Sequence, residues 1–182
     1  MNTILVALFT IIIVASLLTA LYIILYNKLQ FSKIRIDEAE RVILEEIKNR
    51  YDLVMQCKNI IKKTTKKEID ILKDIESSYK TNTSSYLIEK KINDGIKTIY
   101  VINNDYPKLE TKKEYKEIMR KIEESNERIE AAKSFYNKNN ATLISLIKSF
   151  PSNIIALIHK IEIKPFYDGK EIFNEIDDGI KI

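Results

Sequence analysis

The stretch ILVALFTIIIVASLLTALYIILY, residues 4–26, contains no charged residue, no glycine and no proline. As an α-helix it would be about 35 Å long, against a hydrocarbon layer of about 30 Å. It is therefore long enough to cross a bilayer with a slight tilt. A cleaved signal peptide is the alternative, but residues 1–3 carry no basic side chain and the apolar run is too long for a signal sequence. We predict a transmembrane helix at 4–26 after a short external N-terminus at 1–3.

Four cations predict the direction of this helix across the membrane. Lys28, Lys33, Arg35 and Arg41 follow it, whereas no side-chain cation precedes it. Cytoplasmic flanks of membrane helices carry an excess of Lys and Arg. The pattern predicts a single-pass protein of the cell membrane with its N-terminus outside and its C-terminal domain in the cytoplasm. The single cysteine, Cys57, cannot form an internal disulfide, as is usual in the cytosol.

The remaining residues have the composition of a charged helical domain. All 30 basic and 26 acidic residues follow Tyr26, and the chain has only three glycines, three prolines and no tryptophan. Few helix breakers among many Lys, Glu and Ile residues favour helix over sheet. The formal net charge of +4 is nearly balanced, so the strong basic field of a nucleic-acid-binding protein is missing. We therefore predict an all-α chain that does not bind nucleic acid.

The segment after the span predicts a long amphipathic helix. Apolar residues recur at helical spacing from Ile36 to Ile75, and no glycine or proline separates Tyr26 from Ile36. The lysine-rich run at 62–67 interrupts this pattern, and Thr65 has capping-box spacing to the glutamate three residues later. The sequence leaves open whether this helix is continuous or broken near Thr65.

Two further helices are predicted downstream. The small polar residues at 81–85 indicate a loop, and the apolar spacing at 86–103 indicates a shorter helix. The run at 103–107 ends in a proline and stops that helix. Thr111 and Glu114 have capping-box spacing directly after this breaker, so we predict that they start the next helix.

That helix has the clearest periodicity in the chain, because one residue in seven is a large apolar or aromatic one, at Tyr115, Ile122, Ile129, Tyr136, Leu143 and Phe150. Residues 150–153 break it before a short apolar helix at 154–161. The sequence thus predicts an elongated antiparallel three- to four-helix bundle at 27–164, with coiled-coil-like packing, followed by a flexible acidic tail at 165–182. The seam could be buried within one chain or between chains, so a homo-oligomer is one alternative.

Four segments, taken in order, resemble the LemA family of bacterial membrane proteins. They are Tyr26-Asn27-Lys28-Leu29 with Ile36-Asp37-Glu38-Ala39; Asn49-Arg50-Tyr51-Asp52-Leu53-Val54; Tyr106-Pro107-Lys108-Leu109; and the run from Glu127-Arg128-Ile129 through Ala132-Lys133-Ser134-Phe135-Tyr136-Asn137 to Phe150-Pro151-Ser152-Asn153. The resemblance extends from about Tyr26 to Asp168. It departs from the family at Met55-Gln56, where the family has Pro-Asn, and in the place of the basic residue before Phe-Tyr-Asn.

The resemblance implies a bacterial cell-membrane protein with an external N-terminus and a cytoplasmic helical bundle. It also implies an association with membrane stress proteins, including a membrane-embedded metalloprotease, and thus a membrane protease as one candidate partner. It supplies no catalytic residues. The lipid bilayer is a predicted partner through residues 4–26.

The sequence offers little for catalysis or for cofactor binding. His159 and Cys57 are the only histidine and cysteine, so a zinc site built from such ligands cannot form within one chain. The glycines at 95, 169 and 179 are too scattered for a phosphate-binding loop. We predict no enzyme activity, no metal and no cofactor, with Cys57 as a small core residue and His159 as a packing or surface residue.

A role in protein–protein interaction is the remaining prediction. The chain is interpreted as a membrane-anchored scaffold or adaptor; an accessory regulator of a membrane protease or envelope-stress system is the alternative, and an unrecognised membrane-bound enzyme is a remote one. The candidate contact residues are charges that flank a tyrosine, the Tyr-Asn pair of the third helix and the apolar break after it: Arg50, Asp52, Tyr136, Asn137, Phe150, Pro151 and Ile155.

Overall fold

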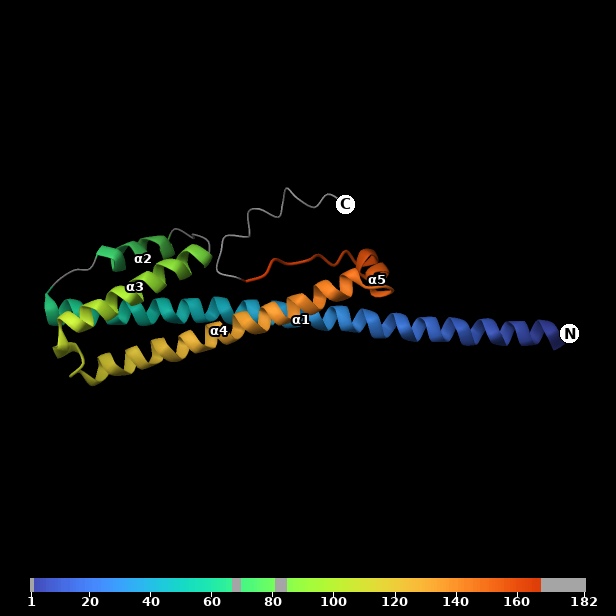
Figure 1. Cartoon of the computed structure of the whole chain (residues 1–182), viewed down its shortest axis with the longest axis horizontal. Helices are drawn as coiled ribbons and strands as arrows, with labels where there is room; N and C mark the ends of the chain where they lie inside the picture. The colour runs from blue at the N-terminus through green and yellow to red at the C-terminus, as the bar shows by residue number, and fades with distance from the viewer. Residues whose placement is uncertain (1, 67–69, 81–84, 168–182) are drawn as a thin grey trace.

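The computed structural model of the chain describes residues 2–66, 70–80 and 85–167, and these residues form helices without any β-strand. The predicted all-α class is confirmed. The elements, in chain order, are α1 (Asn2–Thr65), α2 (Asp70–Lys80), α3 (Ser85–Asp105), the 3-10 helix η1 (Pro107–Leu109), α4 (Lys113–Lys148) and α5 (Ser152–Ile158) (Figure 1).

One uninterrupted helix, α1, runs from the N-terminus to the far end of the bundle (Figure 1). Its 64 residues include no glycine or proline, so nothing in the sequence breaks its hydrogen-bond ladder. At its end, Lys66 adopts a left-handed φ of 57° and its N–H donates to the carbonyl of Lys62 at 3.0 Å. This is a common helix terminus. The helix therefore ends at Thr65, which decides the alternative that the sequence left open.

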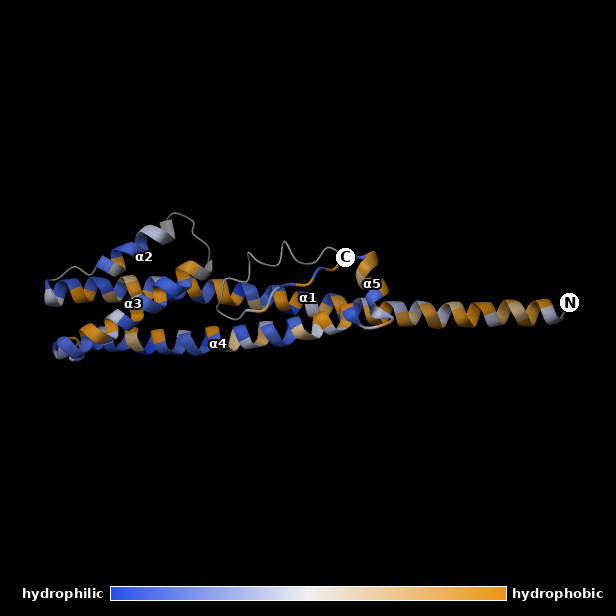
Figure 2. Ribbon diagram, turned by 45° about the horizontal axis from the view of Figure 1, so that its top comes forward, coloured by the Kyte–Doolittle hydropathy of each residue, from blue (hydrophilic) through white to orange (hydrophobic). Residues whose placement is uncertain are grey.

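The N-terminal third of α1 extends beyond the bundle and is apolar on all sides (Figure 2). Its large apolar side chains from Ile4 to Ile24 are 40–68% exposed, whereas Leu29 and Ile36 are fully buried. A helix that is apolar all round requires an apolar environment. Among the described residues, α1 alone is by itself long and apolar enough to cross a membrane; α4 and α5 qualify only as a pair bent by 97°.

The second long helix, α4, lies antiparallel along α1. At one end Lys112 Nζ donates to Thr64 Oγ1 at 2.8 Å, and at the other Tyr22 Oη and His159 Nε2 are 2.7 Å apart. Five of the six residues of the seven-residue period are buried in this contact: Tyr115, Ile122, Ile129, Tyr136 and Leu143. The last, Phe150, is 80% exposed. The seam is filled by α1 of the same chain.

The two shorter helices, α2 and α3, pack on each other and on α1. Gly95 permits the close approach, because a Cβ there would lie 2.5 Å from Ile75 Cδ1 and 3.2 Å from Leu72 Cδ2. The glycine thus weakens α3 locally but admits α2. The helix predicted at 86–103 is confirmed with slightly wider bounds, Ser85–Asp105.

The capping box predicted at Thr111 is wrong. The helix begins at Lys113 without a side-chain cap, and Thr111 Oγ1 instead donates to the carbonyl of Lys108 at 2.8 Å. A threonine hydroxyl can satisfy a preceding carbonyl as readily as a following N–H, which makes the spacing ambiguous. Residues 81–84 of the predicted loop lie outside the described residues.

After α5 the chain turns back along the bundle (Figure 1). Lys160 has a left-handed φ of 49°, and the N–H of Ile161 donates to the carbonyl of Ala156 at 3.0 Å, as in a Schellman motif. The helix therefore ends at Ile158, three residues before the end of the predicted segment. The flexible tail predicted at 165–182 is wrong at Pro165 and Tyr167, which are hydrogen-bonded to α4; residues 168–182 lie outside the described residues.

Candidate functional site

The segment 161–167, which we call the strap, is held on α4 through its main chain. Tyr136 Oη donates to the carbonyl of Pro165 at 3.1 Å. Asn137 makes two bonds with one residue, because its Nδ2 donates to the carbonyl of Tyr167 at 2.8 Å and its Oδ1 accepts the N–H of Tyr167 at 2.6 Å. The Tyr-Asn pair that resembles the family motif therefore fixes the path of the strap.

The strap is also tied to α1. Lys164 Nζ donates to Asp37 Oδ1 at 2.8 Å and to Glu40 Oε2 at 2.7 Å, while Asn140 Nδ2 donates to the carbonyl of Lys164 at 2.7 Å. The lysine is partly buried, which lowers its pKa, but the two carboxylates outweigh this effect and raise the pKa of Lys164 overall. The strap thus joins the two long helices on one side of their contact.

A buried ion pair lies where α3, α4 and the strap meet. Lys133 Nζ donates to Glu89 Oε1 at 2.6 Å, and the Tyr167 hydroxyl donates to Glu89 Oε2 at 2.9 Å. Glu89 and Lys133 have side chains that are only 7% and 15% exposed. Burial, together with the neighbouring Glu89 carboxylate, raises the pKa of Tyr167.

Arg50 extends this network into the interior. Its residue is 3% exposed, its Nη2 donates to Asn93 Oδ1 at 2.6 Å, and its Nε has no protein partner among the described residues. Burial lowers the pKa of Arg50, while the negative charges of Glu89, Glu130 and Glu46 act in the opposite direction. Arg50 and Glu89 are therefore structural parts of the bundle core, because solvent hardly reaches them, whereas Glu130 lies at the surface.

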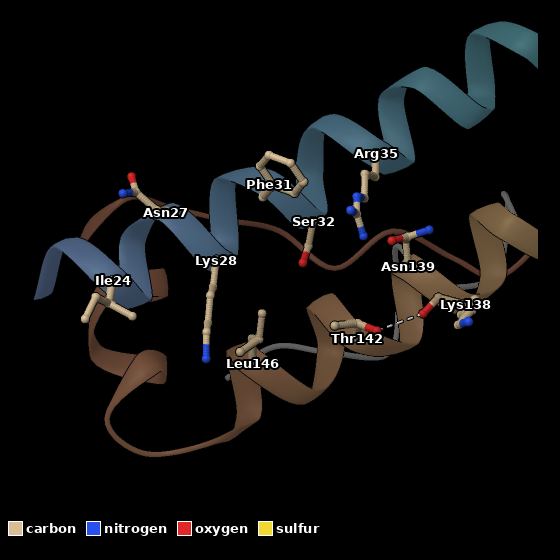
Figure 3. Close-up of a pocket in the computed structure, with 10 residues that line it drawn as sticks. All are labelled: Ile24, Asn27, Lys28, Phe31, Ser32, Arg35, Lys138, Asn139, Thr142 and Leu146. Carbon is tan, nitrogen blue, oxygen red and sulfur yellow. Dashed lines mark hydrogen bonds between the residues drawn. The ribbon is translucent and has the colours of Figure 1, made fainter. Parts of the chain in front are cut away.

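A cavity of about 700 Å³ opens between α1 and α4 where α1 leaves the bundle (Figure 3). We call it the open pocket. Its residues come from one face of each helix and combine cations, small polar groups and apolar side chains: Ile24, Asn27, Lys28, Phe31, Ser32, Arg35, Lys138, Asn139, Thr142 and Leu146. The pocket places polar and charged side chains beside apolar ones, with Ile24 and Leu146 at the end nearest the span, which is a suitable arrangement for an amphipathic ligand.

The open pocket is positively charged. Lys28, Arg35 and Lys138 line it without any acidic residue in its wall, and within the described part of the chain none of them has a carboxylate partner. The Lys28 and Arg35 side chains extend from α1 toward α4, and the Ser32 hydroxyl points the same way (Figure 3). Arg35 also stacks on Phe31, with its guanidinium carbon 4.7 Å from the ring centroid.

A second candidate surface is formed by apolar side chains around α5. We call it the α5 patch; its members are Phe150, Ile154, Leu157 and Ile158, which are 80, 50, 80 and 62% exposed. His159 places the patch beside the last turns of the apolar span, because its ring lies 4.6 Å from the ring of Tyr26. An exposed apolar group of this kind marks a contact with lipid or with a protein.

Cys57, the single cysteine of the chain, lies in the protein core. Cys57 is fully buried, its Sγ lies 4.0 Å from Met119 Sδ, and burial raises the pKa of its thiol to about 12. It is thus a small core residue, as predicted, and it is protonated at neutral pH. The described residues hold no group of three or more His, Cys, Asp and Glu side chains placed to bind a metal.

The seven predicted contact residues do not form one surface. Arg50, Tyr136 and Ile155 are buried, Asn137 and Pro151 are half-buried, and Asp52 and Phe150 are exposed. Burial of the first three follows from their packing in the core and beneath the strap. Only Phe150 joins an exposed apolar patch, and the neighbours that complete this patch are on the outer face of α5.

The open pocket was not predicted from the sequence, although the part of it on α1 has a recognisable spacing. Lys28, Phe31 and Arg35 lie on one face of α1 at spacings of three and four residues. Their partners Lys138 and Thr142 lie more than a hundred residues away. Which face of α4 opposes which face of α1 depends on the register of the two helices, and the periodicity alone does not specify it.

The fold and these sites define the class of protein: a long helical bundle carried by one apolar helix that is compatible with a membrane anchor. The chain belongs to the LemA family, whose family model matches residues 39–176. The match begins after the first of the four similar segments, except for Ala39, and extends past Asp168. No protein with a curated description matches the chain.

Proposed function

We propose that the chain is a single-pass scaffold of the bacterial cell membrane, with its N-terminus outside and its bundle on the cytoplasmic face. The observation that carries the proposal is the continuity of α1, which is bare and apolar up to Ile24 and buries one apolar stripe against the bundle from Leu29 onward. A helix without a hinge transmits the position of the span to the bundle. Such a chain holds its surfaces at a fixed height and angle relative to the bilayer.

The direction of insertion is supported by the cations beyond the span. Lys28, Lys33, Arg35 and Arg41 are all exposed on α1, and Lys28 is close enough to the end of the span to interact with the cytoplasmic headgroups. A reporter fused after Ile182 should score as cytoplasmic. An external score would contradict the orientation without affecting the fold.

The α5 patch is the surface that we assign to a partner protein in the same membrane. It lies at the level of Tyr22 and Tyr26, where the transmembrane segment of a neighbour would be within reach. Three of its four large side chains are exposed on a helix of seven residues, which is too short to bury them itself, and Phe150 just before the helix is exposed as well. A membrane protease as the partner would make the chain an accessory regulator of that protease.

Site-specific photocrosslinking in cells tests this function. A photoreactive side chain at Leu157 should give a discrete protein adduct, whereas the same group at Leu44, an exposed leucine on the bundle section of α1, should not. Mass spectrometry of the adduct identifies the partner. Adducts with lipid alone at Leu157 would contradict the scaffold role of the patch.

A further inference from the structure

The open pocket has a position and a chemistry that the scaffold function does not use. We propose that it binds the headgroup of one anionic phospholipid from the cytoplasmic leaflet, with the phosphate held by Lys28, Arg35 and Lys138. This inference rests on the proposed function, because a bilayer lipid reaches the pocket only if residues 4–26 cross the membrane.

The depth of the pocket matches the headgroup layer. A hydrocarbon layer of about 30 Å that begins at Ile4 ends near Ile24, since about 20 helical residues span it. Lys28 is then about 6 Å beyond that boundary and Arg35 about 16 Å beyond it. The headgroup region is about 5–8 Å thick, so Lys28 lies within it, while the longer Arg35 side chain reaches back toward it.

The charges of the pocket match a phosphodiester. Lys and Arg are the side chains that most often bind phosphate, Arg through two parallel bonds and Lys as a point charge. The three cations line the pocket from two helices, and its wall contains no carboxylate to neutralise them. The hydroxyl of Ser32 points into the same space and can donate to a headgroup oxygen (Figure 3).

The apolar part of the pocket distinguishes a lipid from a small soluble anion. Ile24 and Leu146 line the end nearest the span, where they would contact the glycerol and the first acyl carbons, and Phe31 adds an apolar side chain further along α1. Ile24 is 54% exposed and Phe31 60% exposed. A cavity of about 700 Å³ is also much larger than one phosphate ion requires. One ligand that satisfies both ends is an anionic phospholipid.

Native mass spectrometry of the full chain in detergent micelles tests the proposal. Phosphatidylglycerol and phosphatidylcholine, added separately at equal concentration, are the lipid probes. The wild type should retain one phosphatidylglycerol per chain and little phosphatidylcholine. The triple variant K28Q/R35Q/K138Q should bind phosphatidylglycerol at least tenfold more weakly, because each cation near an anionic surface strengthens binding about fivefold.

Two further variants separate this site from general charge and from misfolding. The control K63Q/K108Q/K113Q removes the same charge from exposed lysines at the far end of the bundle and should retain the lipid as the wild type does. Thr142→Trp fills the pocket but keeps all three cations; Thr142 is exposed, so the fold should persist in circular dichroism. This variant should lose the lipid as well.

Three results would overturn the inference. They are equal retention of phosphatidylcholine, equal loss of lipid in the control variant, and displacement of the lipid by an equal concentration of glycerol 3-phosphate, which would assign the pocket to a soluble anion. Failure of the proposed function is recognised separately. If alkaline washing extracts the chain from cell membranes, the anchor itself is disproved, whereas micelles test the pocket with the span always embedded.

Discussion

The contact between α1 and α4 has two flanks, and they differ in how their polar groups are satisfied. On one flank the strap and α3 cover the seam, and Lys164, Lys133 and Asn137 all have partners within the chain. On the other flank, Lys28 and Arg35 face an open pocket. On α1, Asp37 and Glu40 lie on the strap side of the buried stripe, and Lys28 and Arg35 lie on the pocket side. The helical period places each pair about 90° from the stripe.

The difference shows which side of the bundle is structural and which is available. A flank whose charges and amides are mostly paired inside the chain contributes to folding and offers little to a ligand. A flank with unpaired cations beside exposed apolar side chains can bind a ligand or a partner outside the chain. The covered flank should therefore be sensitive to substitution in a stability measurement, and the open flank should be tolerant near the pocket.

The largest effect is expected at Glu89 on the covered flank. Glu89→Ala leaves Lys133 and the Tyr167 hydroxyl without their shared acceptor, and removal of one partner of a buried pair costs about 3–5 kcal/mol. Because Lys133 keeps Glu130 at 3.0 Å, we expect a loss near the lower value, about 3 kcal/mol. Urea unfolding of the full chain in micelles, followed by circular dichroism, measures it.

The matched control for this prediction is Glu130→Ala. Glu130 contacts the same lysine, but its side chain is 62% exposed, so its loss should cost less than about 1 kcal/mol. Should Glu89→Ala fail to fold, Glu89→Gln keeps the shape and should be intermediate. Equal effects of the Glu89 and Glu130 variants would show that the pair is not buried in solution.

The comparison of flanks also shows how far the sequence determines this fold. The apolar span, the helix ends near prolines and the seam from Tyr115 to Leu143 could all be predicted, because each follows from a local pattern or a period. Phe150 continues the period and yet is exposed, because Pro151 ends the helical direction in which the period has meaning. A seven-residue period therefore places side chains on one face only within a continuous helix.

The strap and the pocket could not be predicted for a different reason. Lys164 binds Asp37 and Glu40, which are more than a hundred residues away in the sequence, and no local pattern predicts such a contact. Polar seam positions are also ambiguous in sequence: Ser125 is fully buried in the seam, and its hydroxyl donates to Glu46 Oε2 at 2.6 Å. These features depend on tertiary register.

A smaller effect is expected where a single side chain holds the strap. Asn137→Ala removes both bonds to the main chain of Tyr167, which should lower the unfolding free energy by about 2 kcal/mol at about 1 kcal/mol per bond. Chymotrypsin should also cut after Phe166, which is 43% exposed, faster than in the wild type. The comparison variant, Asn27→Ala on the open flank, alters an exposed side chain and should change stability by less than about 0.5 kcal/mol.

The smallest effect is expected at an ion pair that links α1 and α4 on the open flank. Further from the span, Arg128 Nε donates to Glu46 Oε1 at 2.7 Å. Burial alone would raise the pKa of Glu46, but hydrogen bonds from Arg128, Ser125 and Asn49 prevail and lower it below the ordinary value. A carboxyl with a lowered folded-state pKa stabilises the fold above its unfolded pKa, and this contribution is lost as the pH falls through the folded value.

Glu46→Gln should therefore cost about 1 kcal/mol at pH 7, discounted because Arg128 is half exposed, and the difference from the wild type should shrink below about pH 4. Urea titrations at pH 7, 5 and 3 measure both points. Glu38→Gln, which removes an exposed carboxylate from the same helix, should leave the wild-type pH profile intact. A difference that stays constant with pH would mean that Glu46 acts through packing and not through its charge, and the open flank would then have no paired section at all.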